Sequence, residues 1–262
     1  MRLSIIIPVY NSEKILPFLV KAIFKNLKNK IPKYEIILVN DFSRDKSWNK
    51  IVDLSKKYKF IKGIDHKQNY GQHTAIFTGL KYSKGDNIIC LDDDMQHDPI
   101  YLYEIYKKLD KGYDVCYVKY LNRQHSKIKI FFSWLNNIVS SYIMNKSSKV
   151  YTSSFKGFSK NIKNNIINAS SKFIFLDYWI INNSKNLTTI EVKHKKRAIG
   201  VTNYNIRELF TLWSKMFFIV EVKKISLRTF IIISFRFLFR TFFRKYVKLE
   251  NNIKISINKT TF

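Results

Sequence analysis

Three consecutive aspartates, Asp92-Asp93-Asp94, form the densest group of chemically active side chains in the sequence, and Gln96 follows them closely. Adjacent carboxylates repel one another, so a bound divalent cation would relieve the repulsion. Mg²⁺ and Mn²⁺ take oxygen ligands, commonly one or two carboxylates together with the phosphate oxygens of a substrate. In an extended chain Asp92 and Asp94 point to one side and Asp93 to the other, which favours Asp92 and Asp94 as the convergent pair.

Each acidic group in the first half of the sequence also has a structural interpretation. The aspartate run could be a solvated acidic turn, or a helix cap before Pro99 that Asp98 could supply alone. Asp41 could cap the helix expected after it, or it could accept hydrogen bonds from a nucleobase. Glu13 is either an acid in the first turn of a helix or a nucleotide contact. The position of each group relative to the strands must decide between the structural interpretation and a ligand-binding role.

Short apolar runs alternate with segments of helical periodicity along the first half of the chain. The expected strands are residues 3–9, 34–39, 61–64, 87–91 and 114–120, and the expected helices are residues 12–29, 47–58, 72–81 and 99–111. This alternation predicts an α/β fold with a mainly parallel, Rossmann-like sheet flanked by helices. Ligands of such sheets bind beyond the carboxyl ends of the strands. Tyr10-Asn11, Asn40-Asp41 and the aspartate run all follow strands, so we expect them at one edge of the sheet.

Taken together, these groups resemble the motifs of family 2 glycosyltransferases, which have the GT-A fold, in order and spacing. The branch that looks most similar is that of the polyprenyl-phosphate sugar transferases, such as dolichyl-phosphate mannose synthase and its bacterial undecaprenyl-phosphate relatives. The resemblance covers about residues 3–215. The segments that carry it are Ile6-Ile7-Pro8-Val9-Tyr10-Asn11, Val39-Asn40-Asp41-Phe42-Ser43, Asn69-Tyr70-Gly71-Gln72, residues 91–99, Phe155-Lys156-Gly157-Phe158 and residues 194–204.

The resemblance implies an inverting transferase that moves a sugar from a nucleoside-diphosphate sugar to a polyprenyl phosphate, with Mg²⁺ or Mn²⁺ as cofactor, for synthesis of a cell-surface glycan. The donor-binding residues that it implies are Pro8, Tyr10, Glu13, Asp41, Asp92 and Asp93. The metal ligands that it implies are Asp92, Asp94 and Gln96, with Asp94 also catalytic. Arg197 would neutralise charge on the phosphates, a role that suits a planar guanidinium.

The role of Asp177 depends on which of two classes of acceptor the enzyme uses. It lies in an apolar segment, residues 173–182, where an unpaired carboxylate is costly to bury, so it could pair with a lysine. It could instead be a catalytic general base that activates a sugar hydroxyl. A phosphate acceptor is already a nucleophile and needs no base. A polyprenyl phosphate is therefore the first choice of acceptor, and a lipid-linked saccharide, with Asp177 as base, is the alternative.

The sequence departs from the family pattern in three places. Asn40-Asp41-Phe42-Ser43 stands where Asp-Asp-Gly-Ser is usual, so the glycine of that turn is replaced. Gly200-Val201-Thr202-Asn203-Tyr204 keeps a hydroxyl at Thr202 where serine is usual. Some relatives carry two long membrane-spanning helices after the catalytic domain, and these helices have no full counterpart in this sequence.

The net charge of +28 is concentrated in the second part of the chain, since residues 1–100 carry +6 and residues 101–262 carry +22. Such asymmetry favours a polyanionic partner: nucleic acid, nucleotide phosphates or an anionic membrane. The acidic residues 92–98 and the lack of a basic-aromatic RNA motif argue against nucleic acid. A catalytically inactive membrane scaffold is the other rival, which turnover of a sugar nucleotide would exclude.

Residues 225–248 combine apolar side chains at helical spacing with Arg236, Arg240 and Arg244, which recur every four residues. Seven uncharged residues separate Arg228 from Arg236, too few for a conventional membrane-spanning helix. We therefore expect a catalytic domain over residues 1–222, and a membrane-associated amphipathic helix with a polar tail over residues 223–262. Because no signal peptide is apparent, we expect a peripheral enzyme on the cytoplasmic face of the membrane. A second copy of the chain is a further candidate partner.

Overall fold

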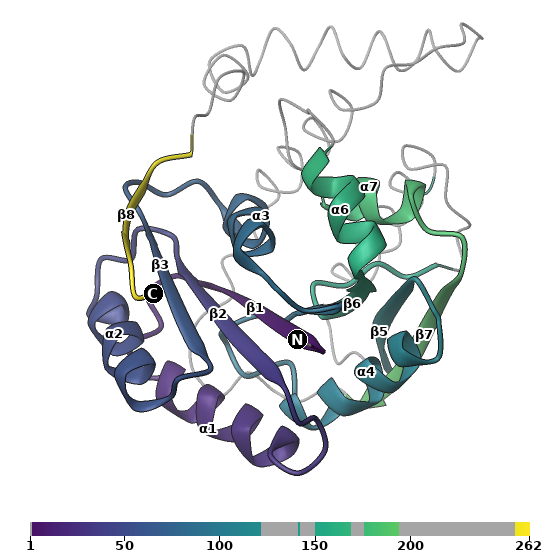
Figure 1. Cartoon of the computed structure of the whole chain (residues 1–262), viewed down its shortest axis with the longest axis horizontal. Coiled ribbons are helices and arrows are strands. Elements are labelled where there is room, and N and C mark those ends of the chain that lie inside the picture. Colours follow the sequence, from purple (N-terminus) through teal and green to yellow (C-terminus); the bar gives the residue numbers. More distant parts are fainter. Residues whose placement is uncertain (1, 122–140, 142–149, 169–175, 194–254) are drawn as a thin grey trace, which may run out of the picture.

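Strands from both halves of the chain join in one sheet in the computed structural model, which describes residues 2–121, 141, 150–168, 176–193 and 255–262. In this part of the chain the strand order is β7-β5-β6-β4-β1-β2-β3-β8 (Figure 1). The strands are β1 (Leu3–Val9), β2 (Tyr34–Asn40), β3 (Ile61–His66), β4 (Asn87–Cys90), β5 (Val115–Leu121), β6 (Lys156–Ser159), β7 (Leu187–Lys193) and β8 (Ile257–Thr260). The helices are α1 (Leu16–Leu27), α2 (Ser47–Lys57), α3 (Gln72–Tyr82), the 3-10 helix η1 (Pro99–Tyr101), α4 (Leu102–Asp110), α6 (Lys160–Asn168) and α7 (Leu176–Asn182).

The strands of the first half are parallel, as their alternation with helices predicted. β1 lies between β2 and β4 and is parallel to both, with Leu3 opposite Tyr34 on one side and Asn87 on the other. The second half adds β6, which is antiparallel to both β4 and β5, and β7, which is parallel to β5. Parallel pairing brings the carboxyl ends of β1, β2, β3 and β4 to one edge of the sheet.

Helices cover both faces of the sheet, and the alternation of side chains along the strands supplies both cores. Ile5 and Ile7 of β1 pack with α1, α2 and α4, whereas Ile6 packs on the opposite face with α3, α6 and α7 (Figure 1). All seven residues of β1 are buried, because the strand is central and covered on both faces. Each fully buried aliphatic side chain contributes about 1.5–3 kcal/mol. The predicted α/β architecture is confirmed.

Two local features differ from the sequence-based expectation. The first helix begins at Leu16 rather than at residue 12, because the Ser12 N–H donates to Ser47 Oγ (2.8 Å) and the chain makes a turn there before it becomes helical. Near the end of the chain, where we expected polar residues without a strand, Ile257–Thr260 form β8, antiparallel to β3.

Among the described residues, the helices are all too short or too polar to cross a membrane. The expected amphipathic segment 225–248 lies outside the described residues, as do Arg197 and residues 200–204. The membrane helix therefore stays a prediction.

Candidate active site

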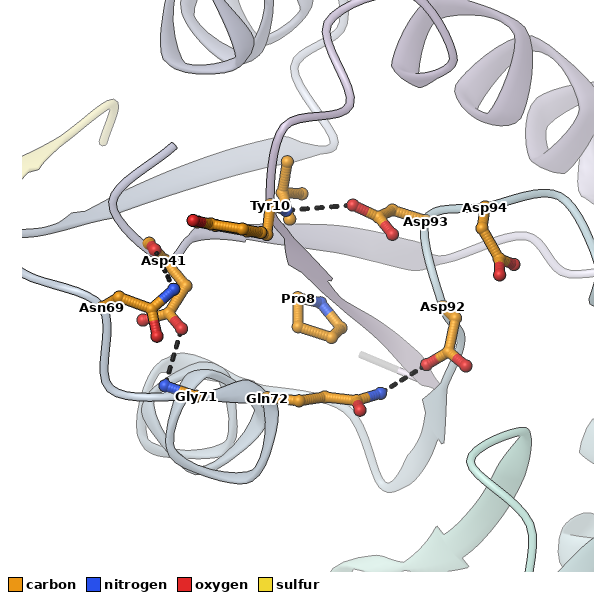
Figure 2. A pocket seen from close by; sticks show the side chains of 10 residues that line it. Pro8, Tyr10, Asp41, Asn69, Gly71, Gln72, Asp92, Asp93 and Asp94 are labelled. Atoms are coloured by element: carbon orange, nitrogen blue, oxygen red, sulfur yellow. Dashed lines mark hydrogen bonds between the residues drawn. The ribbon is translucent and has the colours of Figure 1, made fainter. Parts of the chain in front are cut away.

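A pocket with a volume of about 310 Å³ lies at the carboxyl ends of β1, β2 and β4. Figure 2 shows Asp41 at one end of the pocket, the three consecutive aspartates at the other, and Pro8 between them. The lining residues are Pro8, Val9, Tyr10, Asp41, Asn69, Gly71, Gln72, Asp92, Asp93 and Asp94. The three polar clusters that we expected at one edge of the sheet thus converge on a single cavity.

Asp41 follows β2 directly and is held by the loop that follows β3. Its Oδ1 accepts a hydrogen bond from the Tyr70 N–H (2.9 Å) and lies 2.8 Å from His66 Nδ1, while its Oδ2 accepts from the Gly71 N–H (2.7 Å; Figure 2). Gly71 has φ 86° and ψ 160°, a conformation that is essentially restricted to glycine. At the start of α2 it is Asp45, not Asp41, that accepts a backbone hydrogen bond, from the Ser47 N–H to its Oδ1 (2.9 Å). Asp41 is therefore an oriented carboxylate in the pocket wall.

Phe42 keeps the left-handed turn for which the motif elsewhere uses glycine. Its φ is +60°, and its side chain is 51% exposed. The left-handed region costs a residue with a Cβ about 1–2 kcal/mol. Phe42 therefore adopts the backbone conformation that glycine tolerates best, at an energetic cost that the surrounding contacts must balance.

Asp92 is surrounded by donors that keep it ionised. Its Oδ1 accepts from Gln72 Nε2 (2.6 Å; Figure 2), and its Oδ2 accepts from Ser154 Oγ (2.7 Å) and lies 3.2 Å from His97 Nε2. Burial by itself raises the pKa of this carboxyl, but hydrogen bonding and charge from His97, with the Ser154 hydroxyl, outweigh burial and hold the pKa below its usual value. Asp92 is therefore negatively charged over the whole neutral range.

Asp93 points away from the other two carboxylates and fastens the end of β1. Its Oδ2 accepts from the Tyr10 N–H (3.0 Å) and from Ser12 Oγ (2.5 Å), so its side chain is directed at the loop after β1 (Figure 2). Burial raises the pKa of Asp93 to about 6, against the two hydrogen bonds, and the neighbouring charges of Asp92 and Asp94 raise it further. The opposite direction of Asp93 agrees with the alternation expected of an extended chain.

Asp94 lines the pocket, whereas Gln96 is absent from the lining. The Oδ1 atom of Asp94 accepts from the Gln96 backbone N–H (3.0 Å). The described residues contain no group of three or more His, Cys, Asp or Glu side chains that could by themselves hold a metal ion. Of the metal ligands expected from sequence, Asp92 and Asp94 thus share the pocket, and Gln96 lies next to it in the chain.

Two other residues expected in the site, Glu13 and Asp177, lie elsewhere. The Glu13 Oε2 atom accepts from the Lys46 N–H (2.8 Å) just before α2, and Glu13 does not line the pocket. Asp177 lies in α7, where its Oδ1 is 2.5 Å from Lys156 Nζ and 2.8 Å from Tyr117 Oη. The lysine pairing that we had considered for Asp177 is therefore present. Arg197 is outside the described residues.

The family described as Glycosyl transferase family 2 matches residues 4–175, well over half of the chain. The chain belongs to this family. This is the family that the order of its motifs suggested.

Curated relatives narrow the resemblance within the family. The undecaprenyl-phosphate 4-deoxy-4-formamido-L-arabinose transferase of Serratia proteamaculans is 30% identical over 212 residues, which are 80% of this chain and 65% of the relative. The protein of the same name from Photorhabdus laumondii is 29% identical over 212 residues, with the same coverage. The chain thus spans less than two thirds of the length of these relatives, and its similarity is to polyprenyl-phosphate sugar transferases.

Solved structures show the fold. Glucosyl-3-phosphoglycerate synthase from Mycobacterium tuberculosis, with phosphoglyceric acid, has a TM-score of 0.62 at 12% identity, covering 85% of this chain and 81% of the other. The complex of that enzyme with Mn²⁺, uridine diphosphate and phosphoglyceric acid has a TM-score of 0.60 at 14% identity, covering 82% and 78%. S. aureus TarS has a TM-score of 0.54 at 18% identity, covering 94% and 74%. At these identities the likeness shows the fold alone, and it agrees with the expected GT-A fold.

Several side chains that support this site had no role in the sequence analysis. His66 connects Asp41 to Thr78, whose Oγ1 lies 3.0 Å from His66 Nε2. His97 stands against Asp92, and its Nδ1 lies 2.8 Å from Tyr120 Oη. The position of His97 inside the aspartate motif was a usable signal. Ser154 offered none, because it reaches Asp92 from a distance of 62 residues along the chain.

Proposed function

We propose that this glycosyltransferase moves a sugar from a nucleoside-diphosphate sugar to a polyprenyl phosphate, with inversion at the anomeric carbon. The observation that carries the proposal is the placement of aspartate side chains at both ends of the pocket, with Asp41 at one end and Asp92 and Asp94 at the other (Figure 2). A nucleoside diphosphate matches this arrangement: a base with N–H groups would contact Asp41, and a diphosphate with its cation would lie beside the aspartates. The relatives, whose names specify undecaprenyl phosphate, support the acceptor.

The carboxylates at the diphosphate end fit a divalent cation. Asp92 and Asp94 supply hard oxygen ligands from one pocket wall, and the hydrogen bonds on Asp92 orient its carboxylate. Mg²⁺ and Mn²⁺ are commonly held by one or two carboxylates and by substrate phosphates, so a third protein carboxylate is not required. When bound, the cation would stabilise the charge that develops on the leaving diphosphate. Among the solved relatives, the mycobacterial synthase was crystallised with Mn²⁺ and uridine diphosphate.

The chemistry with a phosphate acceptor needs no general base in the protein. An oxygen of the polyprenyl phosphate attacks the anomeric carbon and forms the new C–O bond. The bond from that carbon to the donor diphosphate breaks, and the leaving diphosphate takes the electron pair. We propose that Arg197 faces the phosphates and helps to neutralise them. Since no proton has to leave the acceptor, Asp177 is free to remain paired with Lys156.

A lipid-linked saccharide is the second candidate acceptor. Its hydroxyl would need a base, and Asp177 was the candidate expected from sequence. The position of this carboxylate favours the phosphate acceptor, because Asp177 Oδ1 contacts Lys156 Nζ and Tyr117 Oη and Asp177 does not line the pocket.

We further propose that the catalytic domain spans residues 1–222 and that residues 225–248 bring the enzyme to the cytoplasmic face of an anionic membrane. The basic residues of this segment support the proposal, since each is worth about 1 kcal/mol near an anionic leaflet. Flotation with liposomes tests it. Binding should be stronger on anionic than on zwitterionic vesicles, and it should weaken when Arg236, Arg240 and Arg244 are changed to Glu. Equal flotation without this segment would overturn it.

The transfer reaction itself is tested with the full chain, undecaprenyl phosphate and Mg²⁺ against a panel of uridine, guanosine and adenosine diphosphate sugars. We expect a glycosylated lipid phosphate from one class of donor. Transfer to a lipid-linked saccharide but not to undecaprenyl phosphate would replace the first acceptor by the second. No consumption of any donor in the panel would overturn the proposed function.

A further inference from the structure

The C-terminal strand β8 lies against the strand that leads into the Asp41 end of the pocket. It is antiparallel to β3, with Lys259 opposite Asp65 and Ile257 opposite His66, and the register shifts between these two pairs. Figure 1 shows β8 at the edge of the sheet beside β3. His66, the last residue of β3, has its Nδ1 2.8 Å from the Asp41 carboxylate. The strand β8 therefore contacts β3, and His66 of β3 contacts Asp41, a pocket residue more than 200 positions before β8 in the sequence.

A first link runs through Tyr70 from Ser256, the residue just before β8. The backbone N–H of Ser256 donates to Tyr70 Oη (2.9 Å), and the carbonyl of Ser256 accepts from the Lys67 N–H (3.0 Å). The Tyr70 ring packs edge-on against the His66 ring, with centroids 5.2 Å apart and planes at 87°. The backbone N–H of the same Tyr70 donates to Asp41 Oδ1. Fixing the Tyr70 side chain therefore also fixes an N–H that orients the Asp41 carboxylate.

A second link runs through Asp65, which β8 and β2 share. Asn258 Nδ2 donates to Asp65 Oδ2 (2.8 Å), and Asn40 Nδ2 donates to Asp65 Oδ1 (2.6 Å). Asn40 directly precedes Asp41, and both Asn40 and Asp65 are buried. A buried carboxylate that loses a donor must find another partner, so the loss of Asn258 would disturb Asp65 and, with it, Asn40.

We propose that β8 is a positioning element of the nucleoside end of the pocket, acting on Asp41 through Tyr70 and through Asp65. Tyr70 and Asn258 are positioning residues in this arrangement, since the ligand would touch Asp41 and neither of them. Among the described residues, the hydrogen bonds to the aspartates at the other end come from different groups, Gln72, Ser154, His97, Tyr10 and Ser12, none of which belongs to β8. The naming of the ligand as a nucleoside diphosphate rests on the proposed function.

The two ends of the pocket can therefore be tested with two ligands. A nucleoside diphosphate spans both ends, whereas inorganic pyrophosphate has no base and reaches the aspartate end alone. If β8 positions Asp41, weakening either link should lower the affinity for the nucleoside diphosphate and leave the affinity for pyrophosphate unchanged. A general loss of folding would lower both affinities.

The experiment uses the full chain and the variants Tyr70→Phe and Asn258→Ala, each of which deletes one hydrogen-bonding group. Thr260→Val is the matched control, because Thr260 lies in the same strand and its hydroxyl donates to the Phe262 carbonyl rather than to the pocket wall. Calorimetric titration with Mg²⁺ measures the Kd of UDP, GDP, CDP, ADP and pyrophosphate. For the nucleotide that the unaltered chain binds best, we expect each variant to raise Kd about 3–10-fold, the size of one hydrogen bond. The same variants should raise the donor KM similarly, with kcat within about twofold.

The outcomes distinguish a failure of the proposed function from a failure of the positioning role of β8 alone. If the unaltered chain binds none of the four nucleotides, the proposed function fails and the role of β8 fails with it. If the unaltered chain binds one, but Tyr70→Phe and Asn258→Ala bind it equally well, the positioning role alone is wrong. The positioning role is also wrong if both variants weaken pyrophosphate as much as the nucleotide, or if Thr260→Val weakens the nucleotide as much as they do.

Discussion

Lys156 and Asp177 form an ion pair, with 2.5 Å between Lys156 Nζ and Asp177 Oδ1, one strand away from the aspartate end of the pocket. Lys156 lies in β6 opposite Cys90, two residues before Asp92, and is 2% exposed. Tyr117 donates its hydroxyl to the same carboxylate oxygen, and burial, together with the charge of Asp177, raises the Tyr117 pKa well above its usual value. This pairing gives Asp177 a structural reason to be present, independent of catalysis.

Asp177→Asn should therefore destabilise the protein while transfer to undecaprenyl phosphate persists. Removing one partner of a buried pair costs about 3–5 kcal/mol, because Lys156 keeps its charge. Chemical denaturation measures the free energy of unfolding, and initial rates at a temperature where the variant is folded measure transfer. The double variant Lys156→Met/Asp177→Asn removes both charges and should recover part of the lost stability. A loss of transfer of about 1,000-fold or more in the folded single variant would identify Asp177 as a base and favour the saccharide acceptor.

Phe42→Gly should stabilise the fold. The +60° φ of Phe42 costs about 1–2 kcal/mol, which glycine avoids, while glycine loses about 0.5–1 kcal/mol more backbone entropy on folding. The expected net gain is about 0.5–1 kcal/mol in the free energy of unfolding, measured by denaturant titration. Phe42→Ala is the matched control, since it removes the ring but keeps the Cβ and the strain. If Phe42→Gly is no more stable than Phe42→Ala, the turn is unstrained.

Asp94→Asn should abolish metal-dependent transfer without unfolding the protein. The amide keeps the shape of the side chain and loses the charge that would hold Mg²⁺ or Mn²⁺, so we expect a loss of at least about 100-fold. Asp98→Asn is the matched control from the same acidic run, because Asp98 caps η1, with its Oδ1 accepting from the Ile100 N–H (3.1 Å), and asparagine caps equally well. Chelation with excess EDTA should have the effect of Asp94→Asn. Full activity in EDTA would contradict a metal requirement.

Glu35→Gln should lower stability in a pH-dependent way. Glu35 is buried, and burial alone would raise its pKa, but hydrogen bonds from Lys62, Ser4 and the Lys84 N–H outweigh burial and lower the pKa below the ordinary 4.5. Because the pKa is lower in the folded protein, the stabilisation is fully present above pH 4.5 and is lost as the pH falls through the lowered value.

At pH 7 we expect Glu35→Gln to cost about 1–3 kcal/mol in the free energy of unfolding, and this difference should shrink as the pH falls below 4.5. Denaturant titrations at several pH values measure it. Glu104→Gln, at an exposed position of α4, is the control and should change stability by less than about 0.5 kcal/mol at pH 7. A difference between Glu35→Gln and the unaltered chain that is constant with pH would show that the Glu35 charge is unimportant.

Local patterns in the sequence were enough to predict the parallel half of the sheet and the main content of the pocket. Strand and helix periods are properties of neighbouring residues, so β1 was predicted with its observed bounds. Parallel strands bring their carboxyl ends to one edge, and the meeting of Tyr10, Asp41 and Asp92 follows from that rule alone. The direction of Asp93 follows from the alternation of an extended chain.

The tertiary structure alone decided which distant side chains support these residues. The partners of Asp92 and Asp41 come from other strands and loops: Ser154 lies 62 positions from Asp92, and His66 lies 25 positions from Asp41. The strand β8 and the ion pair of Asp177 are also products of long-range packing. A hydrogen bond or an ion pair depends on distances of about 3 Å between atoms, and no local spacing in the sequence specifies such a distance between segments far apart in the chain. The sequence by itself therefore determined the elements and the chemistry at their ends, while the packing of the sheet and its helices chose the groups that orient that chemistry.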